Sequence, residues 1–153
     1  MKNLLYLNVL LLSILFMFSC SKDSDNDNNL AGTYSVSQII LENCDPSSIN
    51  IVVNFNNQDC VTQNDYIHCR SGKLILNRDN TFTSTISTTR GSVSLGFSLP
   101  FFSLNKQGNY QVSNTTMNLC VGNDCDDFTI SNDKLSYTYS SLGCTNTIVL
   151  KKE

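Results

Sequence analysis

The segment LILNRDNTFTSTIS, residues 74–87, decides the fold class. Its centre, Asp79-Asn80, is a typical turn signal, since both side chains hydrogen-bond readily to nearby backbone. On either side of the turn an apolar residue occupies every second or fourth position: Leu74, Leu76, Phe82 and Ile86. Alternation of this kind is typical of a strand that buries one face. The segment therefore predicts two antiparallel strands joined by a tight turn.

The same alternation continues over most of the chain beyond residue 30, and no convincing helical period occurs. We predict strands at or near residues 32–41, 51–55, 73–77, 81–87, 92–99, 108–113, 117–121, 128–130, 135–139 and 148–150. Arg90-Gly91 is interpreted as one of the turns, and Pro100 ends the strand before it or keeps that strand at an edge. Residues 42–70 are polar, and we expect a long excursion with a helical turn near Asp65.

About eight to ten short strands joined by tight turns indicate an all-β fold. We predict an antiparallel up-and-down β-barrel, with a β-sandwich as the alternative. A barrel is favoured because closure removes exposed strand edges. A closed antiparallel meander also needs an even number of strands.

The N-terminus has the pattern of a secretory signal. Lys2 supplies the only early charge, residues 4–18 are almost wholly apolar, and Ser19 precedes Cys20. The last four residues, Met-Phe-Ser-Cys, resemble the bacterial lipoprotein signal of the Bacteroidetes type. This resemblance implies that residues 1–19 are removed and that Cys20 carries a lipid anchor in the outer membrane. An ordinary signal peptide and an uncleaved anchor are the alternatives.

Residues 20–29 are expected to form the lipidated cysteine and a disordered acidic tether, because residues 21–29 include no apolar side chain. Lys22-Asp23 and the acids after it look like the export signal of Bacteroidetes surface lipoproteins. We therefore expect exposure at the cell surface. The chain has 10 basic and 13 acidic residues and no basic patch, which argues against a nucleic-acid partner. Residues beyond the tether are enough for one domain, which we expect to be a monomer.

A family resemblance covers most of residues 30–153. Leu30-Ala31-Gly32-Thr33-Tyr34 resembles the lipocalin start Leu-x-Gly-x-Trp, with Tyr34 in place of the Trp. Residues 74–82 and the final strand followed by lysines are similar to the lipocalin-like domains of Bacteroidetes lipoproteins. The resemblance implies a lipocalin-like barrel at residues 30–153, displayed on a lipid-anchored tether. It also implies that the barrel binds a small apolar ligand.

Seven cysteines become six once Cys20 is lipidated, which suits an oxidising compartment with up to three disulfides. Zinc is disfavoured because no C-x2-C pair occurs and His68 is the only histidine. Cys120 and Cys125 flank a turn between two strands, so we predict that they pair. In an up-and-down barrel the first strand ends near the start of the last. This predicts the remaining pairs as Cys44 with Cys144 and Cys60 with Cys69, whereas a Cys120–Cys144 bond would contradict both assignments.

No residue constellation predicts catalysis, so we expect a non-enzymatic protein without cofactor or metal. A lone histidine such as His68 is usually a surface or loop residue. The acidic group around Cys125 could bind calcium, but acidic turn residues explain it better: Asp124, Asp126 and Asp127.

Two binding hypotheses remain. The first is a surface-displayed module that holds a small apolar ligand in the barrel, although aromatic residues on strand faces more often fill a barrel core. The second is a protein-interaction or inhibitor module that uses barrel loops. Phe101 and Phe102 follow Pro100 and are the candidate partner contacts, since exposed apolar side chains mark interaction surfaces.

Overall fold

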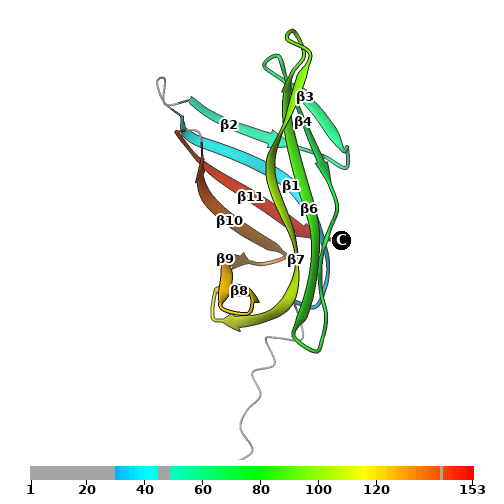
Figure 1. The fold of residues 1–153 in the computed structure, drawn as a ribbon, viewed down its shortest axis with the longest axis vertical. Coiled ribbons are helices and arrows are strands. Elements are labelled where there is room, and N and C mark those ends of the chain that lie inside the picture. The colour runs from blue at the N-terminus through cyan, green and yellow to red at the C-terminus, as the bar shows by residue number, and fades with distance from the viewer. Residues whose placement is uncertain (1–29, 45–48, 142) are drawn as a thin grey trace, which may run out of the picture.

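The computed structural model describes residues 30–44, 49–141 and 143–153, so Cys20 and the tether lie outside the described residues. Eleven strands form a single antiparallel sheet (Figure 1). They are β1 (Gly32–Cys44), β2 (Ile49–Asn54), β3 (Cys60–Gln63), β4 (Tyr66–Ser71), β5 (Leu74–Leu76), β6 (Thr81–Ser92), β7 (Phe97–Ser113), β8 (Thr116–Val121), β9 (Asp124–Ser131), β10 (Lys134–Ser141) and β11 (Cys144–Lys152). The described residues include no helix with the length and apolar composition needed to cross a bilayer.

Eight of these strands close into a barrel, as predicted. Consecutive hairpins join β6 to β11, and β11 pairs with β1. The short strand β5 pairs with β1 on one side and with β6 on the other, which completes the ring. The ring therefore has the even strand number that an antiparallel closure requires.

The polar excursion supplies three strands outside the ring. β2 extends the sheet beyond β1, and β4 and β3 extend it beyond β6. β4 and β5 pair with successive stretches of β6, and Gly72 forms the bend between them with φ of +74°. A Cβ there would lie 2.0 Å from the Thr85 carbonyl oxygen, so only glycine fits. The helical turn expected near Asp65 is wrong, because Asn64 and Asp65 form the reversal between β3 and β4, both with positive φ.

The barrel is complete at one end only. At this closed end β8 pairs with β7 only through Asn109–Ser113 of β7, and β9 pairs with β10 only through Lys134–Ser136 of β10. Toward the other, wide end, the sheet divides into two wings, β2-β1-β11-β10 and β7-β6-β4-β3 (Figure 1). Two features explain the division: β5 and β8 are shorter than the strands on either side of them, and β9 pairs with β10 through only three residue pairs.

Alternating inward residues fill the interior of the barrel. Burying each large apolar side chain contributes roughly 1.5–3 kcal/mol. The largest fully buried side chains are Tyr34, Phe55, Phe82, Tyr110, Phe128, Ile39, Leu41, Leu74, Ile86, Met117, Leu119 and Leu135. The two tyrosine hydroxyls are satisfied: Tyr34 donates to the Leu30 carbonyl at 2.7 Å and Tyr110 to the Asn77 carbonyl at 2.8 Å. The core therefore leaves none of its phenol groups without a partner.

The strand predicted at residues 92–99 is instead a hairpin tip, and the turn predicted at Arg90-Gly91 is part of β6. The chain reverses at residues 93–96, where Asp65 holds the tip. The Val93 amide donates to the Asp65 carbonyl at 3.0 Å, and the Ser94 hydroxyl donates to the Asp65 carboxylate at 2.5 Å. β7 then passes through Pro100, which adjoins a β-bulge at residue 101 and needs no ladder amide there.

The three disulfides are the pairs predicted from the sequence. Their Cα atoms lie 4.2 Å apart for Cys44–Cys144, 4.1 Å for Cys60–Cys69 and 4.1 Å for Cys120–Cys125. The first pair joins the wide-end termini of β1 and β11. The second and third pairs each staple one hairpin.

Candidate functional site

Phe101 and Phe102 belong to an aromatic seam that bridges the two wings between β7 and β10. The seam consists of Phe101, Phe102, Tyr137 and Tyr139, all half-buried. Phe102 lies with its ring centroid 5.5 Å from Tyr139 and 5.6 Å from Tyr137. The Tyr139 hydroxyl donates to the Phe101 carbonyl at 3.3 Å, and burial raises the pKa of Tyr139 to about 12. The seam thus joins β7 to β10 where β8 and β9 no longer pair with them.

A small ion-pair cluster continues the seam toward the closed end. Lys106 of β7 points inward, and its ammonium lies 3.0 Å from one carboxylate oxygen of Asp124 and 3.0 Å from one of Asp126. These hydrogen bonds, that to Asp126 foremost, raise the pKa of Lys106. Asp127 instead accepts a hydrogen bond from the Asn118 amide at 2.5 Å. The acidic residues around Cys125 therefore fasten β9 to β7 and β8.

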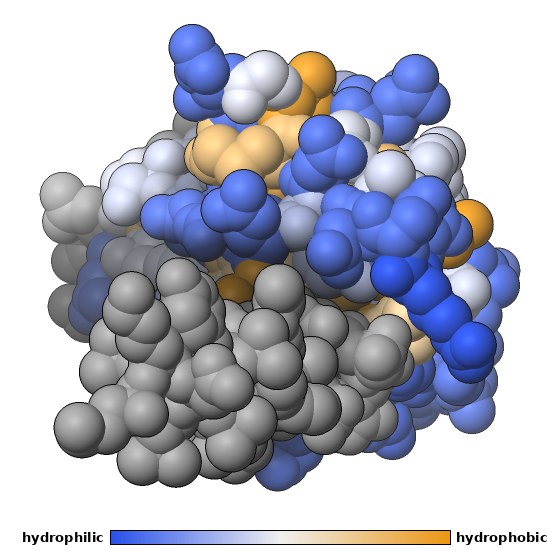
Figure 2. Space-filling view, turned by 90° about the horizontal axis from the view of Figure 1, so that it is seen from below, coloured by the Kyte–Doolittle hydropathy of each residue, from blue (hydrophilic) through white to orange (hydrophobic). Residues whose placement is uncertain are grey.

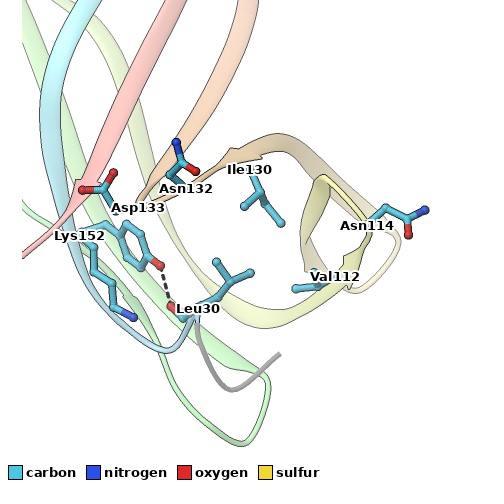
Figure 3. Close-up of a pocket in the computed structure, with 8 residues that line it drawn as sticks. Leu30, Val112, Asn114, Ile130, Asn132, Asp133 and Lys152 are labelled. Carbon is cyan, nitrogen blue, oxygen red and sulfur yellow. Dashed lines mark hydrogen bonds between the residues drawn. The ribbon is translucent and has the colours of Figure 1, made fainter. Parts of the chain in front are cut away.

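One pocket of about 440 Å³, the end pocket, opens at the closed end. Leu30, Val112 and Ile130 converge on it, whereas Asn114 points away (Figure 3). Most of the described surface around this end is hydrophilic (Figure 2). The end pocket therefore combines apolar side chains with polar ones, among them Asn132, Asp133 and Lys152.

A second pocket of about 220 Å³, the mouth pocket, lies on the inner face of the β7-β6-β4-β3 wing at the wide end. It is lined by Tyr66, Arg90, Phe97, Leu99, Pro100 and Phe101. Directly opposed residues on paired strands share a face, so Leu99 lies beside Arg90, and Phe97 lies beside Ser92. Phe97 and Leu99 remain 44% and 61% exposed although they face inward. The mouth pocket is therefore an open, mostly apolar site with a single charged side chain.

Below the mouth pocket the inner face becomes polar. His68 is 1% exposed on β4 and Thr88 is 0% exposed on β6, so the expectation that His68 lies at the surface or in a loop is wrong. The His68 Nδ1, Thr88 Oγ1 and Arg90 Nε atoms are buried and have no hydrogen-bond partner in the described ranges. Burial, together with the neighbouring Arg90 charge, lowers the pKa of His68 to about 4. His68 is therefore a neutral imidazole beside a guanidinium.

Sequence reasoning missed Tyr66 and Arg90 as site residues. One signal was present, because Arg90 continues the inward positions of Phe82 and Ile86 at intervals of four residues. It is also the only charged residue between Asp79 and Lys106. An isolated charge at an inward strand position indicates a functional contact more strongly than a turn.

Comparison with protein-family models, with curated proteins and with solved structures found no match. The fold and the geometry of the mouth pocket therefore carry the functional argument alone. Within the described ranges, no group of three or more His, Cys, Asp or Glu side chains could hold a metal ion.

Proposed function

We propose that this protein is a non-enzymatic binding module whose mouth pocket takes a small apolar ligand. The observation that carries the proposal is the exposure of Phe97 and Leu99 on an inward, concave face. Exposed apolar side chains cost free energy in water, and a ligand that covers them removes this cost. A mostly apolar pocket with few polar groups is the usual form of a small-molecule site.

The ligand is placed in the mouth rather than deep in the barrel because the closed end is filled. Phe82, Met117 and Leu135 there are 1%, 0% and 0% exposed. Small barrels are commonly filled by their own side chains in this way. At the wide end, where the wings separate, Phe97 and Leu99 remain exposed beside open space.

The proposal includes a place in the cell. The signal pattern and Cys20 support a lipid anchor in the outer membrane, and the acidic tether supports display at the cell surface. Three disulfides in the structure fit an exported protein. A monomer on its anchor is sufficient for this role.

The alternative module, which would hold a protein partner through Phe101 and Phe102, has less support. Both side chains are half-buried in the aromatic seam. A substitution of Phe101 or Phe102 would disturb the packing between the two wings as well as a partner-binding surface. The aromatic seam is therefore better explained as a structural contact than as a binding site.

Photolabelling tests the proposed site in the full chain within its own membranes. A neutral alkyl diazirine should attach to mouth residues 97–101, mapped by peptide mass spectrometry. Phe97→Ser with Leu99→Ser should reduce this label by more than half. Val93→Ser with Leu95→Ser is the matched control, because these side chains are exposed on the same hairpin but do not line the pocket. Equal labelling of the two double variants, or no label in residues 97–101, would refute a ligand site in the mouth.

A further inference from the structure

We propose that the ligand of the mouth pocket is a small amphipathic carboxylate, whose head group binds the guanidinium of Arg90. The inference rests on the proposed function and adds the chemical class of the ligand. It is drawn from the surroundings of Arg90, which differ from those of Lys106 and Arg70.

Arg90 is held in place but lacks a counter-charge. Its guanidinium lies 4.1 Å above the Tyr66 ring, which fixes its position. Its Nε is buried without an acceptor, and none of the ion pairs among the described residues includes Arg90. The groups beside it offer no negative charge, since His68 is neutral and Thr88 carries a hydroxyl.

Two other inward cations, Lys106 and Arg70, have their charges compensated within the chain, and Arg90 can be compared with them. Lys106 contacts two carboxylates. Arg70, on the next inward position of β4 from His68, donates to the carbonyl oxygens of Gln58 and Val36 and pairs with Asp59. Each of these cations reaches acceptors within the chain. Of the three, only Arg90 has no ion pair within the described residues and a buried Nε without an acceptor.

Burying part of an unpaired cation is unfavourable, and the Tyr66 ring offsets only some of that cost. An anion that enters the pocket and pairs with the Arg90 guanidinium removes the rest of this free-energy cost. A carboxylate fits best, because its two oxygens match the planar guanidinium fork. The apolar wall of Leu99, Pro100 and Phe101 then receives the rest of the ligand. A volume of about 220 Å³ limits that ligand to a short aliphatic or single-ring body.

Competition against the diazirine label separates the head group from the tail. Octanoate, octan-1-ol and octylamine share one chain and differ in head group. In the unmodified protein, octanoate should displace the label about tenfold more effectively than octan-1-ol, as expected for a hydrogen bond to a charged group. Octylamine should be the weakest competitor.

Variants of Arg90 test the assignment. Arg90→Met should remove the advantage of octanoate and leave competition by octan-1-ol unchanged, whereas Arg90→Lys should retain part of the advantage. Arg78→Met, in the exposed turn between β5 and β6, is the control and should behave as the unmodified protein. Thermal melts verify folding, and Arg90→Lys decides the result if Arg90→Met does not fold.

The outcomes distinguish the two proposals. Equal competition by octanoate and octan-1-ol, with no effect of Arg90→Met, overturns the carboxylate and leaves the apolar site intact. Absence of label in residues 97–101 overturns the proposed function itself. An octanoate advantage that survives Arg90→Met would place the anion elsewhere and also reject the assignment.

Discussion

His68 and Arg90 lie directly opposite each other on β4 and β6, and this environment determines the charge of the His68 imidazole. An imidazole that is 1% exposed loses hydration on ionising, and the guanidinium beside it repels a second positive charge. Both effects favour the neutral ring. The folded protein therefore binds a proton at His68 less readily than the unfolded chain does.

This difference predicts acid sensitivity. The pKa of His68 falls from 6.5 in the unfolded chain to about 4 in the folded protein. The stabilisation is complete above pH 6.5 and is lost as the pH falls toward 4, by about 3 kcal/mol in all. Denaturant titrations across this range should show the loss, and His68→Gln should flatten it. An unchanged pH slope in His68→Gln would contradict the assignment.

At the residue scale, the sequence predicted which apolar side chains are buried better than it predicted the surroundings of the polar ones. The alternation correctly placed Leu74, Phe82 and Leu135 in the core, because apolar periodicity directly reports burial of a face. His68 and Arg90 were misjudged, because a polar residue in a strand pattern can face either side when its register is unknown. The mouth pocket could therefore not be predicted, since it depends on which strands pair.

At the scale of elements, the three disulfides close loops of very different lengths. Cys44–Cys144 spans 100 residues, whereas Cys120–Cys125 spans 5. On the chain-entropy model the long loop stabilises by about 3 kcal/mol more than the short one. Replacing Cys44 and Cys144 by serine should thus lower the free energy of unfolding by that much more than replacing Cys120 and Cys125. Equal losses, measured by denaturant unfolding, would argue against this account.

The aromatic seam is the second contact that holds distant strands together, here β7 and β10. Phe102→Ala should lower the free energy of unfolding by about 2–4 kcal/mol, somewhat less than a fully buried phenylalanine, because Phe102 contacts both Tyr137 and Tyr139. Phe97→Ala serves as the comparison and should cost under about 1 kcal/mol, since that ring is exposed and lies outside the seam. If both variants lose the same stability, the seam does not hold the wings together.

The alternation pattern did not predict where every hairpin reverses. Residues 92–99 alternate strictly, yet the chain turns back within them, because Asp65 supplies the hydrogen bonds that fix the tip. Alternation predicts which residues share a face of an extended chain, and it carries no information about a partner turn some 30 residues away. By contrast Asp79-Asn80, whose turn chemistry is local, was placed correctly.

At the scale of the whole molecule, the barrel was predictable because it is a succession of local hairpins closed by two long-range pairings, β1 with β11 and β1 with β5. Within the excursion, the strand predicted at residues 51–55 corresponds to β2, whereas β3 and β4 were not predicted. The strand count thus followed from the turns, whereas the two wings depend on where β8 and β9 stop pairing with β7 and β10.

The anchor is a whole-molecule prediction. Cys20→Ser should leave the protein soluble or unprocessed, because the lipid attachment point is lost. Membrane fractionation and globomycin sensitivity measure this. Ser19→Ala, which keeps a small residue before Cys20, is the control and should still be anchored. A Cys20→Ser protein that remains in the membrane fraction, with processing insensitive to globomycin, would exclude lipidation.

The short strand β5 closes the barrel by pairing with both β1 and β6. It is the shortest of the described strands, and only three residue pairs join it to β1 and three to β6. Every other ring junction between consecutive strands is backed by a short covalent turn, and the β1–β11 junction by eight pairs and a disulfide. Release of β5 would therefore open the ring and expose the backbone of β1 at residues 32–34 and of β6 at residues 82–84 to a new strand. The closure of the ring thus rests on one tripeptide, Leu74–Leu76.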